Sequence, residues 1–173
     1  AASGGMRDDA RAHAGRESAM SAYMEAACEE ARKGMERGDG GPFGAVVVKD
    51  GRIVSAGHNM VLTTNDSTAH AEIVAIRRAE QVLGTFDLNG CELYTTCYPC
   101  PMCMGATLWA RITRIHYGCT QQEAAAIGFD DARFWAAIHH PKSTEMLEMH
   151  HCESDACRTL FQEWARKSDR HMY

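Results

Sequence analysis

Three cysteines at equal spacing and one upstream histidine place the strongest constraint on how this chain can fold. Cys97, Cys100 and Cys103 lie in the segment CYPCPMC, and His70 begins the tripeptide HAE. Thiolate and imidazole are ligands that Zn²⁺ prefers, so a zinc site here requires segments about 30 residues apart to meet at one point. Four protein ligands close the shell of a structural zinc, whereas three leave a position for water and allow catalysis.

The bulk composition is that of an ordinary globular chain. With 173 residues, 45% hydrophobic and 24% charged, the chain can bury about 70% of its unfolded surface in one core. We expect a single domain over residues 16–173 after a flexible leader or tag remnant over residues 1–15. The net charge of -5 supplies no basic stripe, which favours a small-molecule substrate and no nucleic-acid partner. The chain has neither a membrane-length apolar run nor a signal-peptide core, so we expect a cytoplasmic protein without membrane partners.

Hydrophobic periodicity predicts helices alternating with strands. The expected helices cover residues 16–37, 70–83, 101–110 and a C-terminal segment capped by Ser154. The expected strands cover residues 43–48, a short run from Ile53, 91–96, 114–118 and 144–152. This alternation predicts a layered α/β domain with parallel strands in the middle of the sheet.

Helix geometry indicates which cysteines bind the metal. His70 and Glu72 begin one predicted helix, and Cys100 and Cys103 begin another. Side chains tilt toward the N-terminus of a helix, so residues of the first turn can converge just beyond its end, where the helix dipole favours thiolates. Cys97 ends the preceding strand and is expected to point elsewhere. The predicted shell is therefore His70, Cys100 and Cys103, with water as the fourth ligand of Zn²⁺.

The combination H-x-E and P-C-x-x-C resembles the zinc site of the cytidine-deaminase-like superfamily. Zinc lowers the pKa of bound water from about 15.7 to about 7. Glu72 is expected to take a proton from that water, pass it to a ring nitrogen, and later deliver a proton to the departing amine. The competing interpretation is a non-catalytic structural zinc module, which requires Cys97 as a fourth ligand. The pairs His139/His140 and His150/His151 are explained by a solvated loop and an edge strand, and they are assigned no function.

Four further segments narrow the resemblance to the guanine deaminases of that superfamily: GGPFGAVVVKDG, NDSTAHAEIVAIR, CPMCMGA and GFDD. The similarity runs from about residue 16 to Tyr173. It implies a three-layer α/β/α sandwich with a five-stranded mixed sheet, and a homodimer whose C-terminal segments are swapped between subunits to close each active site. It also implies that zinc-bound hydroxide attacks C2 of guanine to give xanthine and ammonia. Guanosine deaminase is the alternative, and a tRNA adenosine deaminase is disfavoured by the net charge.

The same resemblance assigns roles to individual residues. It implies that Asn59 hydrogen-bonds the purine, that Asp131 accepts hydrogen bonds from it, and that Tyr173 reaches in from the swapped tail. Ala71 is a further candidate for substrate contact. Phe43 and Trp109 are open to two interpretations, as aromatic walls for a planar ring or as core residues.

Overall fold

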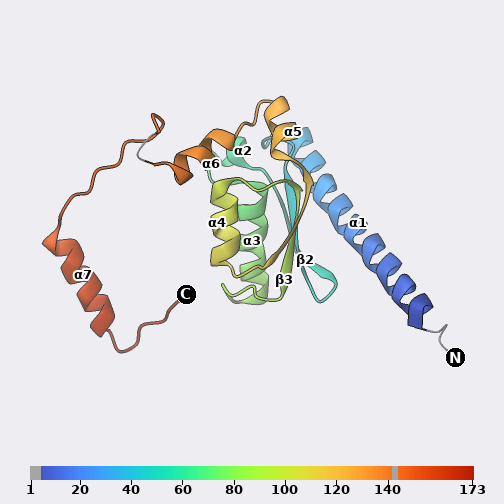
Figure 1. The fold of residues 1–173 in the computed structure, drawn as a ribbon, viewed down its shortest axis with the longest axis horizontal. Coiled ribbons are helices and arrows are strands. Elements are labelled where there is room, and N and C mark those ends of the chain that lie inside the picture. The colour runs from blue at the N-terminus through green and yellow to red at the C-terminus, as the bar shows by residue number, and fades with distance from the viewer. Residues whose placement is uncertain (1–4, 142–143) are drawn as a thin grey trace. The chain divides into compact units, whose positions relative to one another are not determined.

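The computed structural model describes residues 5–141 and 144–173, which divide into two compact units, residues 1–132 and 133–173 (Figure 1). Seven helices and four strands are found in these described residues. The first unit holds α1 (Gly5–Arg37), β1 (Gly44–Lys49), β2 (Arg52–His58), α2 (Val61–Thr64), α3 (Ala71–Leu83), β3 (Cys91–Cys97), α4 (Pro101–Trp109), β4 (Arg114–Cys119) and α5 (Gln121–Ala126). Helix α6 (Ala132–His139) begins at the boundary, and α7 (Asp155–Arg166) belongs to the second unit.

The four strands form one mixed sheet in the order β2-β1-β3-β4. Strand β1 is antiparallel to both β2 and β3, and only β3 and β4 are parallel. The expectation of parallel strands in the middle of the sheet is therefore wrong. The reason is the hairpin, since β2 folds back beside β1 and α3 then carries the chain across β1 to its other side. The predicted five-stranded sheet is not confirmed, because four strands are seen in the described part of the chain.

The β1–β2 hairpin forms as predicted. Asp50 and Gly51 make its two-residue turn with φ values of 49° and 74°. Positive φ at both central residues is the conformation whose twist matches that of antiparallel strands, and an Asp-Gly pair adopts it readily.

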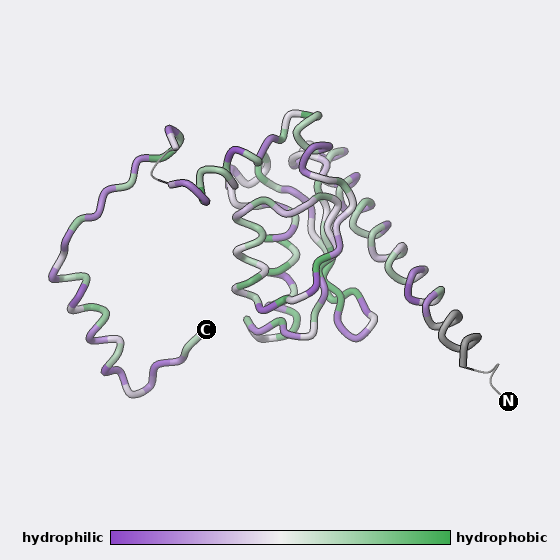
Figure 2. Tube along the Cα trace, in the orientation of Figure 1, coloured by the Kyte–Doolittle hydropathy of each residue, from purple (hydrophilic) through white to green (hydrophobic). Residues whose placement is uncertain are grey.

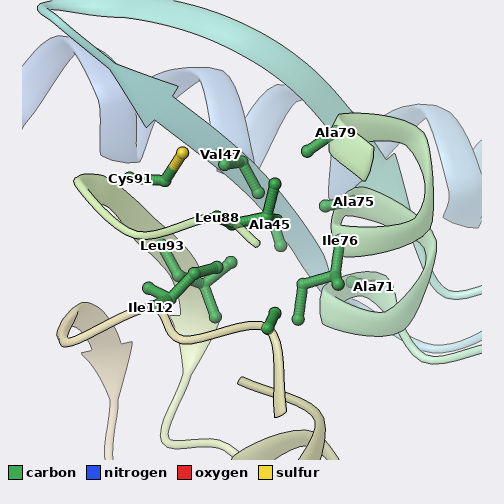
Figure 3. Packing of buried hydrophobic residues seen from close by; sticks show 11 residues of the cluster. Ala45, Val47, Ala71, Ala75, Ile76, Ala79, Leu88, Cys91, Leu93 and Ile112 are labelled. Atoms are coloured by element: carbon green, nitrogen blue, oxygen red, sulfur yellow. The ribbon is translucent and has the colours of Figure 1, made fainter. Parts of the chain in front are cut away.

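Helices cover both faces of the sheet, with α1 on one face and α3 and α4 on the other (Figure 1). Alternate residues of β1 serve the two faces: Val47 belongs to the cluster packed on α3, whereas Val46 belongs to the cluster packed on α1. Figure 3 shows the first cluster, in which Leu93 of β3 and Ile76 of α3 pack in one core with Val47 of β1. The first unit therefore has the predicted three-layer α/β/α arrangement.

Helix α1 is longer than the apolar stripe in the sequence indicated. It begins at Gly5 rather than at residue 16, so residues 5–15 of the expected leader are helical, and residues 1–4 lie outside the described part of the chain. Its stripe reaches the core through Ala27 and Ala31, but Met35 is 47% exposed.

Other differences are local. The loop after β2 contains the short helix α2. Helix α5 was not expected, although Thr120 and Glu123 form a capping box that marks its start.

The C-terminal part of the chain differs most from the expectation. Residues 144–152 form no strand, and Met146, Leu147 and Met149 are exposed. An alternating apolar segment becomes a strand only where a neighbouring strand accepts its backbone hydrogen bonds. Helix α7 forms as predicted, with the Ser154 hydroxyl accepting a hydrogen bond from the Cys157 amide at 3.3 Å.

Among the helices described, none combines the length and the apolar character needed to cross a membrane.

Candidate metal centre

The metal-binding candidates lie at the N-termini of two helices in contact with one another. His70 is the N-cap of α3 and Cys100 is the N-cap of α4, and both have extended backbone (φ -69°, ψ 158° and φ -66°, ψ 168°). An N-cap side chain often hydrogen-bonds the free amides of the first turn, but the His70 side chain does not do so. Cys103 occupies the third position of α4, so its side chain also points toward the N-terminal end of the helix.

The three side chains converge, and the histidine nitrogen lies at distances from the two sulfurs that zinc binding allows. Nδ1 of His70 lies 3.6 Å from Sγ of Cys100 and 3.6 Å from Sγ of Cys103. Tetrahedral zinc with ordinary Zn–N and Zn–S bonds separates a nitrogen from a sulfur by about 3.6 Å, so these residues fit the ion. Within the described residues, this is the only group of three or more potential ligands that comes together.

Cys97 is outside this group. Its Sγ contacts the backbone oxygen of Thr120 at 3.8 Å. Burial raises the pKa of the Cys97 thiol to about 11, and the neighbouring Cys119 adds to the effect. The sulfur of Cys97 thus contacts the backbone after β4, and it is this geometry that leaves Cys97 outside the group.

The ligand cluster of His70, Cys100 and Cys103 favours negative charge on one of its two sulfurs, that of Cys100. The pKa of Cys100 is lowered to about 4, chiefly because Cys103 donates a hydrogen bond to its sulfur and because His70 does so as well. The same hydrogen bond raises the pKa of Cys103, and the bond with Cys100 raises the pKa of His70. A thiolate next to a histidine and a second thiol is thus ready to receive a cation.

Glu72 is the carboxylate in contact with the ligand cluster. It is the second residue of α3 and is buried, with 6% of its surface exposed. Its Oε1 accepts a hydrogen bond from the hydroxyl of Thr95 at 3.1 Å, and its Oε2 lies 3.4 Å from Sγ of Cys103. Burial raises the pKa of Glu72 above its ordinary value. A carboxylate with a raised pKa is suited to accept a proton and give it back.

Two of the predicted substrate contacts lie on loops of the same unit. Asn59 directly follows β2 and is buried. Its backbone N–H donates to the Phe43 carbonyl at 3.0 Å, and its side-chain Oδ1 accepts from the backbone N–H of Val61 at 3.1 Å. Asp131 follows α5, and its pKa is raised by burial and by the charge of Cys100. That electrostatic interaction indicates that the Asp131 carboxyl lies near the ligand cluster.

The remaining candidates have different surroundings. Ala71 is completely buried at the start of α3 and packs in the core. Phe43 packs at the edge of the core with its ring edge against Phe129, the ring centroids being 4.8 Å apart. Trp109 ends α4, at the opposite end from the ligand cysteines, and is 68% exposed. Tyr173 belongs to the second unit and is 72% exposed.

The sequence pattern did not identify two side chains that bear on the site. Thr95 hydrogen-bonds Glu72 from the neighbouring strand, and no spacing rule connects residues 23 positions apart. Phe129 belongs to the GFDD segment, and its ring contacts the ring of Phe43.

The family model of the cytidine and deoxycytidylate deaminase zinc-binding region matches residues 17–119. This chain belongs to that zinc-dependent deaminase family. The deaminase is 42% identical to the guanine deaminase of Bacillus subtilis (strain 168) over 151 residues, which is 87% of this chain and 97% of that protein. The X-ray structure of guanine deaminase from Bacillus subtilis matches it with a TM-score of 0.85 at 41% identity, over 88% of this chain and 98% of that chain.

Two other relatives match less of the deaminase. The tRNA-specific adenosine deaminase of Agrobacterium fabrum is 46% identical over 120 residues, 68% of this chain and 78% of that protein. The structure of guanine deaminase from Nitrosomonas europaea has a TM-score of 0.60 at 37% identity and covers 64% of each chain. The predictions of a hydrolytic deaminase, of Zn²⁺ as its cofactor and of a resemblance to guanine deaminases are confirmed.

Proposed function

We propose that this deaminase hydrolyses guanine at C2, releasing xanthine and ammonia. The observation that carries the proposal is the length of the similarity to the Bacillus subtilis guanine deaminase, which spans 97% of that protein. The similarity to the tRNA-specific enzyme is slightly higher in identity but shorter, at 120 residues against 151. A substrate assignment rests on loops and tails as well as on the zinc motif, so the longer match is the more informative one.

The ligand cluster and Glu72 divide the chemistry between them. His70, Cys100 and Cys103 would hold Zn²⁺, which supplies a water whose pKa is lowered enough for it to react as a nucleophile at neutral pH. Glu72 accepts one proton of this water on its carboxylate and delivers it to a ring nitrogen of guanine. It then takes up the second proton of the water and gives it to the departing amino group, which leaves as ammonia. Thr95 holds Oε1 of Glu72 during these transfers.

Asn59 and Asp131 are proposed to orient the purine. Oδ1 of Asn59 already accepts the Val61 amide, so its side-chain NH₂ group is the part that donates to an acceptor on the base. Asp131 is proposed to accept hydrogen bonds from the N–H groups of guanine. Ala71 and Phe43 would contact the ring, and Trp109 would do so only if the dimer brought it to an active site.

A swapped homodimer is proposed for the assembled enzyme. Helix α7 alternates hydrophilic and hydrophobic residues (Figure 2), and Leu160, Phe161 and Trp164 are exposed in the described chain. Exposed apolar surface of this kind favours contact with another chain. Strand β4 is an edge of the described sheet, so residues 144–152 of a second copy would add the fifth strand there. The swapped tail would bring Tyr173 to the partner's active site.

We also propose that the enzyme works in the cytoplasm.

The test is ammonia release from guanine and from guanosine, measured side by side with zinc-replete protein. The proposal expects turnover of guanine and little or none of guanosine. A Glu72→Gln variant with the same zinc content serves as the inactive control. Preference for guanosine would move the assignment to the nucleoside, and absence of turnover with either substrate would overturn the proposed function.

A further inference from the structure

A buried histidine connects α1 to the loop that carries Asn59. His58 ends β2 and is 5% exposed. Its Nε2 lies 2.8 Å from Oδ2 of Asp39, and its Nδ1 lies 3.4 Å from Oε2 of Glu30. Because a neutral imidazole has one N–H, it can donate to only one of these carboxylates, and both contacts are hydrogen bonds only when the ring is an imidazolium.

Asp39 binds the chain on both sides of Asn59. Its carboxylate meets the ring of His58, the residue before Asn59, and also accepts a hydrogen bond from the hydroxyl of Thr63. Its backbone oxygen accepts the amides of Leu62 at 3.0 Å and Thr63 at 3.4 Å. Residues 58 and 62–63 are therefore tied to one anchor, with Asn59 between them.

Two glycines provide the room for this arrangement. A Cβ at Gly34 of α1 would lie 2.6 Å from Cδ2 of the His58 ring, so a larger residue there would displace the imidazole. A Cβ at Gly40 would lie 2.0 Å from Oδ1 of Asn59, so the loop after Asp39 also packs directly against the Asn59 side chain. The loop that supplies the anchor is thus the same loop that encloses Asn59.

The charges around the imidazole support the arrangement. The pKa of Asp39 is lowered by the hydrogen bond from Thr63 and then by that from His58. Burial raises the pKa of Glu30, but hydrogen bonds from Lys33 and His58 outweigh it and leave the pKa lowered. Two ionised carboxylates thus keep acceptor oxygens on either side of the ring.

We propose that His58, held between Asp39 and Glu30, is a positioning residue that fixes Asn59 for purine binding. The inference rests on the proposed function, because that function assigns the purine contact to Asn59. The link between this loop and the metal centre does not involve Asp39 or His58, since the Met60 amide donates to the carbonyl of Ala69, the residue before His70, at 2.9 Å. Loosening the anchor should therefore affect substrate binding before it affects the proton transfers of Glu72.

The experiment compares Asp39→Ala with Ser55→Ala in zinc-replete protein. Ser55 lies in β2 and is buried, and its hydroxyl donates to the Ala75 carbonyl at 2.7 Å, so its loss removes a buried hydrogen bond of the same strand without touching the anchor. We expect Asp39→Ala to raise KM for guanine by about tenfold or more while kcat changes by less than about threefold, and Ser55→Ala to leave KM unchanged. Asp39→Asn, which keeps an acceptor but no charge, should give a smaller rise in KM and serves as the test if Asp39→Ala does not fold.

Amide hydrogen exchange supplies a second readout that needs no catalysis. We expect the amides of residues 60–63 to exchange faster in Asp39→Ala than in the wild type, and at wild-type rates in Ser55→Ala. An unchanged KM, or a kcat that falls as much as KM rises, would overturn the positioning role. If the wild type releases no ammonia from guanine, the proposed function fails, and the exchange rates then decide by themselves whether the anchor holds the loop.

Discussion

Replacing Glu72 by glutamine separates the chemistry of the site from its architecture. The substitution keeps the size of the side chain and an oxygen that can accept the Thr95 hydroxyl, now 3.1 Å from Oε1. The new NH₂ group takes the place of Oε2, 3.4 Å from Sγ of Cys103, where it can donate to sulfur. Zinc content and fold should therefore persist.

The expected loss of rate follows from the position of Glu72. It is the carboxylate in direct contact with the ligand cluster, so its replacement removes the whole general acid–base contribution rather than part of it. Such a contribution is worth about 10²- to 10⁴-fold, or roughly 3 to 5 kcal/mol at about 1.4 kcal/mol for each factor of ten. We expect kcat for guanine to fall by about 10³-fold.

The stability of the metal-free fold should not fall with the rate. Burial raises the pKa of Glu72 above its ordinary value of 4.5, so the folded protein prefers the protonated carboxyl. For a carboxyl with a raised folded pKa, stability is complete below the unfolded pKa and is lost as the pH rises toward the folded pKa. Glutamine resembles the protonated form, so metal-free Glu72→Gln should be at least as stable as metal-free wild type at pH 7.

The assay combines three measurements on each protein: ammonia release from guanine, zinc by atomic absorption, and thermal unfolding. Glu80→Gln is the matched control, since Glu80 lies on the same helix, is partly buried, and is not in the ligand cluster. Its kcat should stay within about twofold of wild type. If Glu72→Gln with full zinc retained more than about a tenth of the wild-type rate, the assignment of the proton transfers to Glu72 would be refuted.

Three further predictions test the ligand set, the tail and the core. Cys97→Ser should keep one zinc per chain by metal analysis, whereas Cys100→Ser should lose it; loss of zinc from both would return Cys97 to the shell. Deleting Tyr173 should reduce guanine turnover sharply at an unchanged melting temperature, and wild-type rates would remove Tyr173 from the site. Burial raises the pKa of Tyr94 from 10.0 to about 12, so the native state keeps a proton that the unfolded chain loses. Stability should then fall by up to about 2.7 kcal/mol between pH 10 and 12, and Tyr94→Phe should abolish that part of the decline in denaturant titrations.

The positions of His70, Cys100 and Cys103 at the starts of two helices could be predicted because the local geometry is encoded within a few residues. His70 and Cys100 each stand directly before a helix, and the turn that places Cys103 beside Cys100 is contained in the spacing of the two cysteines. The helix over residues 71–83 and the Asp50-Gly51 turn are equally local. In each case, one turn of helix or one hairpin is enough to determine the structure.

The features that the sequence did not reveal depend on distant partners. The direction of β1 relative to β3 is set by the path of α3 across the sheet, not by any residue of either strand. Residues 144–152 carry the alternation of a strand, but a strand also needs an edge to pair with. The contact between His58 and Asp39 joins residues 19 positions apart, and each residue alone has the appearance of an ordinary polar residue in a loop or strand.

The N-cap positions of α3 and α4 show how the site and the fold are linked. A Ser, Thr, Asp or Asn at an N-cap stabilises its helix by about 1 kcal/mol, and His70 gives up that contribution because its side chain faces Cys100 instead. Each helix end also carries partial positive charge, which favours the Cys100 thiolate. A Zn²⁺ ion bound by His70 and Cys100 would join the two helix ends and would offset the stability lost with the missing cap. The feature by which the motif is recognised in the sequence, a candidate ligand directly before each helix, would thus also couple the stability of the folded site to its ion.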